Sequence, residues 1–237
     1  EMGYRRAVLE LGGNDPLIVL RDADIDEAVR LATAGAFKNS GQRCTAIKRI
    51  IIEEPLADDF AAGLADAAST LRVGDPLDPD TDIGTVIGEG EAREFERRMQ
   101  AAIAQGATLL AGGQRRGAQI APAVLDYVQP TMEIVSCETF GPYAPILRVP
   151  DLDAAIHTAN LQAFGLSSGV VTNNLHAVNR CIRELRVGSV NIREVPGYRT
   201  ELTPFGGTKD SGLGVKEGVI EAMKGMTFTK LYTLPWD

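Results

Sequence analysis

The apolar residues of the chain follow two spacings, one typical of strands and the other of helices. Leu17–Leu20 form a short unbroken apolar run, which predicts a buried strand. Apolar residues then recur at helical spacing over 25–36, after a capping-box pattern made by Asp24 and Glu27. The next apolar run, Ile47–Ile52, contains three consecutive isoleucines, a pattern typical of a strand buried on both faces.

Helical and strand patterns continue to alternate along the rest of the chain. The further helices are predicted from Pro55 and over 92–103, 152–159 and 178–185, and the further strands near Thr108–Ala111, Ile120–Val124, Ala144–Val149, Gly169–Thr172 and Ser189–Ile192. Such alternation predicts the α/β class, with a mostly parallel sheet and helices on both faces. Met226–Leu234 alternates loosely and is predicted to be an edge strand.

Composition and charge exclude several classes of protein. Apolar residues make up 44% and charged residues 24% of the 237 residues, as in an ordinary globular protein. The net charge of −8 argues against nucleic acid, whose phosphates it would repel. No apolar run approaches the roughly 18–20 residues needed to span a bilayer. We therefore expect neither nucleic acid nor a membrane as a partner.

The three cysteines are far apart in the sequence and odd in number. The spacing of Cys44, Cys137 and Cys181 suggests neither a disulfide framework nor a metal site. We therefore expect no bound metal, and a reducing compartment, the cytoplasm. Cys181 falls on the apolar stripe of its predicted helix, so we expect it to be a buried core residue.

Cys44 and Glu10 are the candidates for chemistry. Asn39–Gly41 breaks the predicted helix, so Cys44 is expected on a tight loop, where the charge of Arg43 would favour its thiolate. Glu10 follows an apolar strand end and precedes two glycines, and we expect it to be partly buried. A thiolate can attack a carbonyl carbon and a carboxylate can activate water, so the pair predicts a nucleophile and a general base.

Further motifs follow in a fixed order, and together they point to a known family. They are Glu138–Pro142, Phe164–Thr172, and Pro204–Gly207 with Lys209, Ser211 and Gly212. With the Glu10 and Cys44 motifs, they resemble the C-terminal catalytic half of the aldehyde dehydrogenase superfamily over the whole length of the chain. The stretch around Cys44 looks most like the branch that contains phosphonoacetaldehyde, lactaldehyde and non-phosphorylating glyceraldehyde-3-phosphate dehydrogenases.

The resemblance implies a role for each motif. Cys44 would attack the aldehyde carbon and form a thiohemiacetal and then a thioester, which water activated by Glu10 would hydrolyse to the carboxylate. The oxyanion would be held by the Cys44 backbone N–H and an asparagine upstream of this chain. Glu138 would bind the hydroxyls of the nicotinamide ribose and Phe140 would pack near the nicotinamide. The cofactor would be NAD or NADP, and we favour NAD.

The resemblance also implies a domain organisation. Residues 1–21 would be the end of a nucleotide-binding half and a linker, 22–225 the catalytic domain, and 226–237 a C-terminal arm whose strand pairs with a neighbouring subunit. We expect the rest of the nucleotide-binding half to be absent, so that the isolated chain is inactive as a dehydrogenase. The family pattern predicts a homodimer or homotetramer.

Two arginines raise the question of the substrate's charge. Arg43 adjoins the predicted nucleophile, and Arg199 lies in a loop that the resemblance places at the substrate mouth. A guanidinium matches phosphate, phosphonate or carboxylate oxygens, so the pair predicts an anionic aldehyde. An ordinary surface position remains the alternative for Arg199.

Two other classes of function remain open at this stage. A thiol-dependent hydrolase would pair Cys44 with a histidine, yet neither His157 nor His176 lies in a glycine-framed motif. A non-catalytic association module would use the C-terminal strand to bind a partner.

Overall fold

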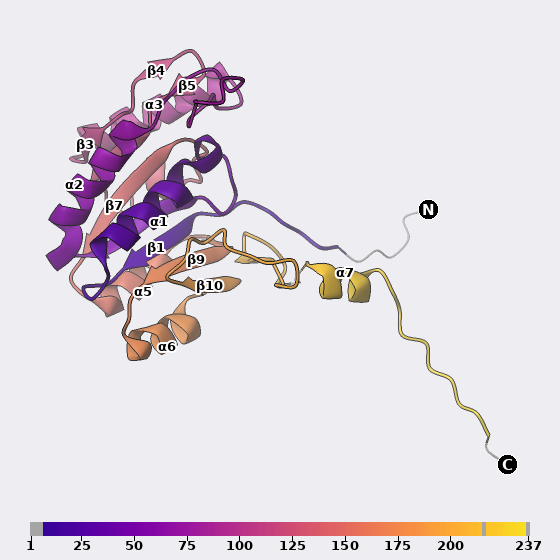
Figure 1. Cartoon of the computed structure of the whole chain (residues 1–237). Coiled ribbons are helices and arrows are strands. Elements are labelled where there is room, and N and C mark those ends of the chain that lie inside the picture. Colours follow the sequence, from indigo (N-terminus) through magenta and orange to yellow (C-terminus); the bar gives the residue numbers. More distant parts are fainter. Residues whose placement is uncertain (1–6, 215–216, 236–237) are drawn as a thin grey trace.

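A seven-stranded sheet forms the centre of the molecule, in a computed structural model that describes residues 7–214 and 217–235. Its strand order is β10-β9-β1-β2-β7-β6-β3 (Figure 1). The strands are β1 (Asp15–Val19), β2 (Ile47–Glu53), β3 (Thr108–Ala111), β6 (Ala123–Asp126), β7 (Tyr143–Val149), β9 (Ser167–Val171) and β10 (Ser189–Ile192). Only β3 pairs antiparallel with its neighbour in this sheet, so the predicted mostly parallel sheet is confirmed.

Helices cover both faces of this sheet, as predicted. One face packs against α1 (Ile25–Phe37) and α2 (Glu54–Thr70). The other face packs against α3 (Glu89–Ala104), α4 (Glu133–Ser136), α5 (Leu152–Asn160) and α6 (Leu175–Glu184). The isoleucine run in β2 has its predicted cause, because Ile50 and Ile52 contact the first group of helices and Ile51 contacts the second.

The turn between α1 and β2 places Cys44. The Asp24 carboxylate caps α1 by accepting a hydrogen bond from the Glu27 backbone N–H at 3.0 Å, as the capping box predicts. After α1 the chain forms a 3₁₀ turn, Lys38–Gly41, in which three successive residues, Asn39–Gly41, have positive φ. These left-handed residues end the helix and return the chain to the sheet edge, where Cys44 precedes β2.

The second predicted strand after α3, Ile120–Val124, is wrong in its bounds. The structure divides it between β5 (Gln119–Ile120), which pairs with β4 (Arg115–Arg116), and the central strand β6. Pro122 lies at the division, and a proline has no N–H to donate to a strand neighbour. A second small pair joins β8 (Phe164–Gly165) to β11 (Thr208–Lys209).

The C-terminal segment leaves the body of the protein. Helix α7 (Val219–Gly225) was not predicted and has no buried residue, and the chain then runs outward without regular structure over 226–235 (Figure 1). The predicted strand Met226–Leu234 is therefore not formed in this single chain, because a strand needs a sheet edge to pair with. Residues 1–6 of the predicted linker and 236–237 of the predicted arm lie outside the described residues.

Two kinds of feature are absent from the described residues. None of the helices in that part of the chain is long and apolar enough to cross a membrane. Within the same residues, no three His, Cys, Asp or Glu side chains gather where they could hold a metal ion.

Gly41 provides a test of the turn that places Cys44. Its φ is +70°, and a Cβ at this position would overlap the backbone carbonyl of Gly141. The left-handed conformation alone costs a residue with a side chain roughly 1–2 kcal/mol, so Gly41→Ala should lower the free energy of unfolding by at least about 2 kcal/mol. Urea unfolding followed by circular dichroism measures the change.

The matched control is Gly90→Ala in α3, where an added Cβ meets nothing within 4 Å. Its stability should be unchanged or higher by up to about 1 kcal/mol. Equal unfolding midpoints for Gly41→Ala and the wild type would contradict the strained turn.

Candidate active site

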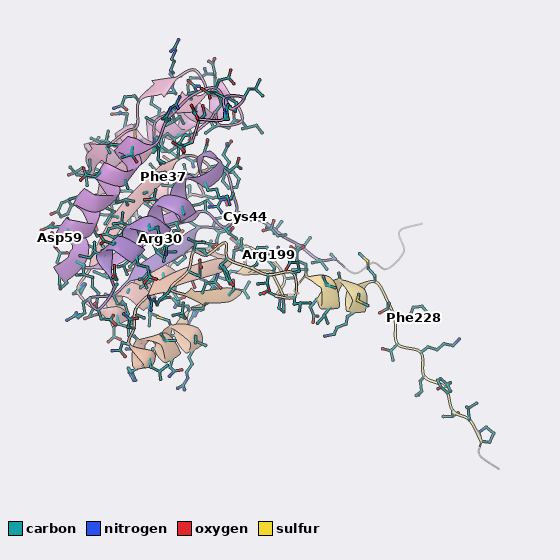
Figure 2. All side chains as sticks on the ribbon, in the orientation of Figure 1. Arg30, Phe37, Cys44, Asp59, Arg199 and Phe228 are labelled. Atoms are coloured by element: carbon teal, nitrogen blue, oxygen red, sulfur yellow. The ribbon has the colours of Figure 1, made fainter. Side chains whose placement is uncertain are left out.

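The predicted site residues lie at the amino ends of neighbouring parallel strands. Glu10 precedes β1, Cys44 precedes β2, and Glu138 and Phe140 precede β7. Because these strands are parallel and adjacent, the segments that lead into them meet at one edge of the sheet. Figure 2 shows Cys44 at this edge, on the side from which the chain leaves towards α7.

Cys44 and Glu10, the predicted nucleophile and base, lie close enough to interact. Cys44 is half-buried, and the Glu10 carboxylate lies near its thiol. Burial raises the pKa of the Cys44 thiol to about 11, and the interaction with the Glu10 carboxylate acts in the same direction. The positive charge of Lys48 acts against them. The thiol is therefore protonated at neutral pH in this state, and Glu10 is the group beside it that can receive the proton.

Glu10 is more exposed than the sequence suggested. It lies in an irregular extended segment before β1, so the expected strand end and partial burial are wrong. The Leu11 backbone N–H donates to the Ser211 carbonyl at 3.2 Å, and a Cβ on Gly212 would lie 2.7 Å from the Leu9 carbonyl oxygen. The C-terminal Lys-Asp-Ser-Gly motif thus holds the segment that carries Glu10.

Glu138 lies at the same edge of the sheet, where its carboxylate contacts the two glycines that follow Glu10. Its Oε1 accepts a hydrogen bond from the Gly13 backbone N–H at 2.7 Å, and Gly12 is so close that any Cβ there would overlap the Glu138 carboxylate. The Glu138 side chain is 21% exposed and Phe140 is 43% exposed. A carboxylate and an aromatic ring are therefore both accessible beside Cys44.

Lys48 is part of the site and was missed in the sequence. It is fully buried, and its Nζ donates hydrogen bonds to the carbonyls of Arg43 at 2.7 Å and Cys44 at 2.8 Å. The same Nζ lies 3.6 Å from Glu138 Oε1 and 5.0 Å from the centre of the Phe140 ring. A lysine inside an apolar strand is rare, and that signal could have identified it.

Asp15, at the start of β1, is the second buried charge that was missed. It is 1% exposed, its Oδ1 accepts a hydrogen bond from the Ser167 backbone N–H at 3.0 Å, and its Oδ2 has no partner in the described part of the chain. Burial raises the pKa of Asp15 to about 7, whereas the charges of Lys48 and Arg49 act to lower it. The candidate site therefore rests on a layer of buried charge.

Arg43 points away from the thiol and towards the end of α1. Its guanidinium donates to the carbonyl of Gly35 at 2.8 Å, and burial lowers its pKa. Arg43 and Cys44 still attract one another electrostatically, as expected, but Lys48 is the cation that acts most to lower the thiol pKa. Arg43 also borders the 195–199 loop, since its Nη1 would lie 3.3 Å from a Cβ on Gly197.

Arg199 lies on the same side of the molecule as Cys44 but has partners of its own (Figure 2). Its guanidinium stacks on the Phe205 ring at 4.7 Å and lies 3.5 Å from a Glu217 carboxylate oxygen. Its side chain is 43% exposed, so it remains accessible to a ligand.

Other motif residues have structural roles. Lys209 Nζ donates to the carbonyls of Asn160 at 3.1 Å and Gln162 at 3.0 Å, and Ser211 Oγ accepts a hydrogen bond from the Gly165 N–H at 3.0 Å. These bonds fix the loop after β11 against α5 and β8.

The other two thiols and both histidines lie outside the candidate site. Cys181 is fully buried in α6, as predicted, whereas Cys137 is exposed. His157 in α5 and His176 in α6 are both exposed, and the partner that the structure gives Cys44 is a carboxylate. This geometry does not favour a cysteine–histidine hydrolase.

Comparison with known proteins agrees with this geometry. The model of the aldehyde dehydrogenase family matches residues 2–232. The chain is 41% identical over 228 residues to the sulfoacetaldehyde dehydrogenase of Neptuniibacter caesariensis, covering 96% of this chain and 50% of that enzyme. It is 38% identical to a lactaldehyde dehydrogenase of Methanococcus aeolicus, covering 96% of this chain and 49% of that enzyme.

A solved structure is similarly close. The glyceraldehyde-3-phosphate dehydrogenase GapN of Methanocaldococcus jannaschii, in complex with NADP, superimposes with a TM-score of 0.89 at 38% identity. The match covers 92% of this chain and 47% of that one, so the chain spans about half the length of these relatives. The resemblance seen in the sequence is confirmed: the chain belongs to the aldehyde dehydrogenase family.

Proposed function

We propose that this chain carries the nucleophile and the general base of an NAD(P)-dependent aldehyde dehydrogenase that forms a thioester on Cys44. The observation that carries the proposal is the proximity of the Glu10 carboxylate to the Cys44 thiol, whose pKa it raises. A thiol with a pKa of about 11 is a weak nucleophile at neutral pH, so it needs a neighbouring base. Glu10 is the group in position to take its proton.

The two side chains then act in turn. Glu10 accepts the Cys44 proton as sulfur bonds to the aldehyde carbon, and the Cys44 backbone N–H would donate to the oxyanion. A bound nicotinamide would accept the hydride and leave a thioester on Cys44. Glu10, having released its proton to solvent, takes one from a water molecule that attacks the thioester carbonyl. The products are the carboxylate and the free thiol.

Glu138 and Phe140 fit the nicotinamide end of the cofactor. Glu138 is fixed by the Gly13 N–H and remains partly exposed, which leaves acceptor positions for two vicinal hydroxyls. A Cβ on Gly12 would overlap this carboxylate, so glycine keeps the cradle open. GapN of Methanocaldococcus jannaschii is complexed with NADP, which supports a nicotinamide cofactor, and the preference for NAD stays a prediction.

An anionic aldehyde is the substrate that we propose. The names of two related enzymes specify a sulfonate-bearing and a phosphate-bearing aldehyde, and the sequence around Cys44 predicts the same preference. Arg43 adjoins Cys44 and borders the loop that leads to Arg199, and the accessible Arg199 guanidinium lies on the same side of the molecule. Arg199 can present its cation on this side, whereas Arg43 would have to leave the Gly35 carbonyl to reach the substrate.

We further propose a cytoplasmic homodimer or homotetramer, held partly by the C-terminal segment. Exposed apolar residues follow one another on α7 and the tail, namely Val219, Ile220, Met223, Met226, Phe228, Leu231, Tyr232 and Leu234. Large exposed apolar patches mark interaction surfaces. We also propose that dehydrogenase activity requires the part of the relatives' length that this chain does not span.

Replacing the base should separate thiol chemistry from turnover. In Glu10→Gln, loss of the carboxylate charge should lower the Cys44 pKa, so alkylation of Cys44 at pH 8 should become faster, by about tenfold for each unit of the shift. In a preparation that turns over an aldehyde, the same change should reduce kcat by roughly 10²–10⁴-fold because the base is lost. Mass spectrometry and NAD(P)H absorbance measure the two effects.

The exposed Cys137 is the internal control for reagent reactivity and should label equally in both proteins. Slower labelling of Cys44 in Glu10→Gln would show that Glu10 does not raise its pKa.

The substrate charge has its own test. An enzyme preparation that contains this chain should show a kcat/KM for phosphonoacetaldehyde roughly 10- to 100-fold above that for propanal. This is the factor expected from one bidentate, charge-assisted hydrogen bond between a guanidinium and the anion. Arg43→Lys should keep the charge but lose the bidentate geometry, so it should keep only part of the preference for phosphonoacetaldehyde. Arg199→Ala removes its cation altogether and should lower the preference as well. Equal efficiencies for the two aldehydes in the wild type would refute the anionic substrate.

The tail can be tested by light scattering. The chain should form dimers or larger species in the micromolar range, and Phe228→Glu with Leu231→Glu should shift it towards the monomer, because a charge at an apolar contact must be desolvated. Arg30→Glu on the exposed face of α1 is the control (Figure 2). A wild type that is monomeric at these concentrations would be contrary evidence.

A further inference from the structure

Lys48 lies at an irregularity between the two strands that carry the site. Asp15 of β1 pairs with Ile47, and Pro16 pairs with Arg49, so the register shifts and β2 holds one extra residue, Lys48. A bulge of this kind reorients side chains out of strict alternation. Here it places a fully buried ammonium directly beneath the loop that bears Cys44.

The contacts of Lys48 join both halves of the candidate site. Its Nζ donates to the carbonyls of Arg43 and Cys44, at 2.7 and 2.8 Å, so it holds the peptide groups immediately before and after the nucleophile. The same Nζ is 3.6 Å from Glu138 Oε1. One buried cation thus contacts the nucleophile loop and the carboxylate that we assign to the cofactor.

The charges around Cys44 alternate in sign. Glu10 contacts the thiol from the segment before β1, Lys48 lies beneath it in β2, and Asp15 lies at the start of β1. Lys48 in turn faces Asp15, Glu138 and Cys44, while Arg49 faces Asp15. Burial lowers the pKa of Lys48, and the charges of Asp15 and Glu138 act against that effect and favour the ammonium form.

We propose that Lys48 is a positioning residue of the active site, whose buried ammonium fixes the Cys44 loop and supports the Cys44 thiolate against the negative charges of Glu10 and Asp15. The catalytic meaning of this role rests on the proposed function. The role itself is a property of the thiol, and it can be measured without cofactor or aldehyde.

The three cysteines of the chain supply three readouts in one experiment. Cys44 reports the proposed effect, the exposed Cys137 reports the reactivity of the reagent, and the fully buried Cys181 reports loss of the fold. Each thiol's rate of reaction with methyl methanethiosulfonate is followed by mass spectrometry from pH 6 to pH 9.5.

Lys48→Met removes the charge and keeps a side chain of similar length. We expect Cys44 to react about tenfold more slowly at pH 8, because one unit of added pKa lowers the thiolate fraction by about that factor. Lys38→Met, at an exposed position in the same connection, is the matched control and should leave the rate unchanged.

Asp15→Asn should have the opposite effect. The Asp15 carboxylate raises the pKa of Cys44, so its removal should accelerate the Cys44 reaction. Because Asp15 has a pKa of about 7, it carries its charge mainly above that pH, and the acceleration should disappear as the pH falls to 6. A purely structural disturbance would not produce this pH dependence.

The outcomes separate cleanly. An unchanged or faster Cys44 reaction in Lys48→Met, with Cys181 still protected, would overturn the proposal. If Cys181 becomes reactive in Lys48→Met, that variant has lost its fold, and Asp15→Asn becomes the deciding variant. A Cys44 reaction that is no faster in Asp15→Asn than in the wild type above pH 7 would then overturn the proposal. If the Cys44 rates contradict the role of Lys48, the proposed aldehyde oxidation by Cys44 and Glu10 is not affected. If the Cys44 rates change as expected but no dehydrogenase activity is found, that result counts only against the proposed function.

Discussion

The parallel pairing of β1, β2 and β7 is the constraint on which the candidate site depends. Parallel neighbours begin at the same edge of a sheet, so the segments before them meet although they lie far apart in the sequence. Glu10, Cys44 and Glu138 each lie in such a segment. Open α/β sheets commonly bind ligands at the carboxyl ends of their strands, and this chain gathers its candidate residues at the amino ends instead.

Close backbone contacts keep this edge in register. Gly12 and Gly13 lie against Glu138 and the Cys44 carbonyl, and Gly41 lies against Gly141, so a side chain at any of these positions would separate the loops. The glycines of the motifs are therefore explained by packing. They keep the Glu138 carboxylate close to the loop that bears Cys44.

Electrostatics gives the site its character. Burial is the main cause that raises the pKa of the Cys44 thiol to about 11, and Glu10 is a second one. In the proposed function the same carboxylate removes the proton when an aldehyde is in place, so one contact would both suppress and enable the reaction. Two buried side chains also act on the pKa of Cys44: the charge of Lys48 lowers it and that of Asp15 raises it. Neither side chain reaches solvent.

The sequence by itself determined the class of the fold, and it singled out Cys44 and Glu10 as the candidates for chemistry. Hydrophobic spacing located the helices and most of the central strands, because burial on one or both faces leaves a direct trace in residue order. The motifs identified the family.

Only the tertiary structure decided how the charges are arranged. Lys48 looked like part of a strand and Arg43 like the cation beside the thiol, yet the register shift between β1 and β2 brings Lys48 beneath Cys44, and the end of α1 engages Arg43. The outward course of 226–235 also came only from the structure, since an alternating pattern cannot say whether an edge is present to pair with it. Side-chain direction at a bulge and the partner of an edge strand depend on contacts between distant segments, and residue order does not record them.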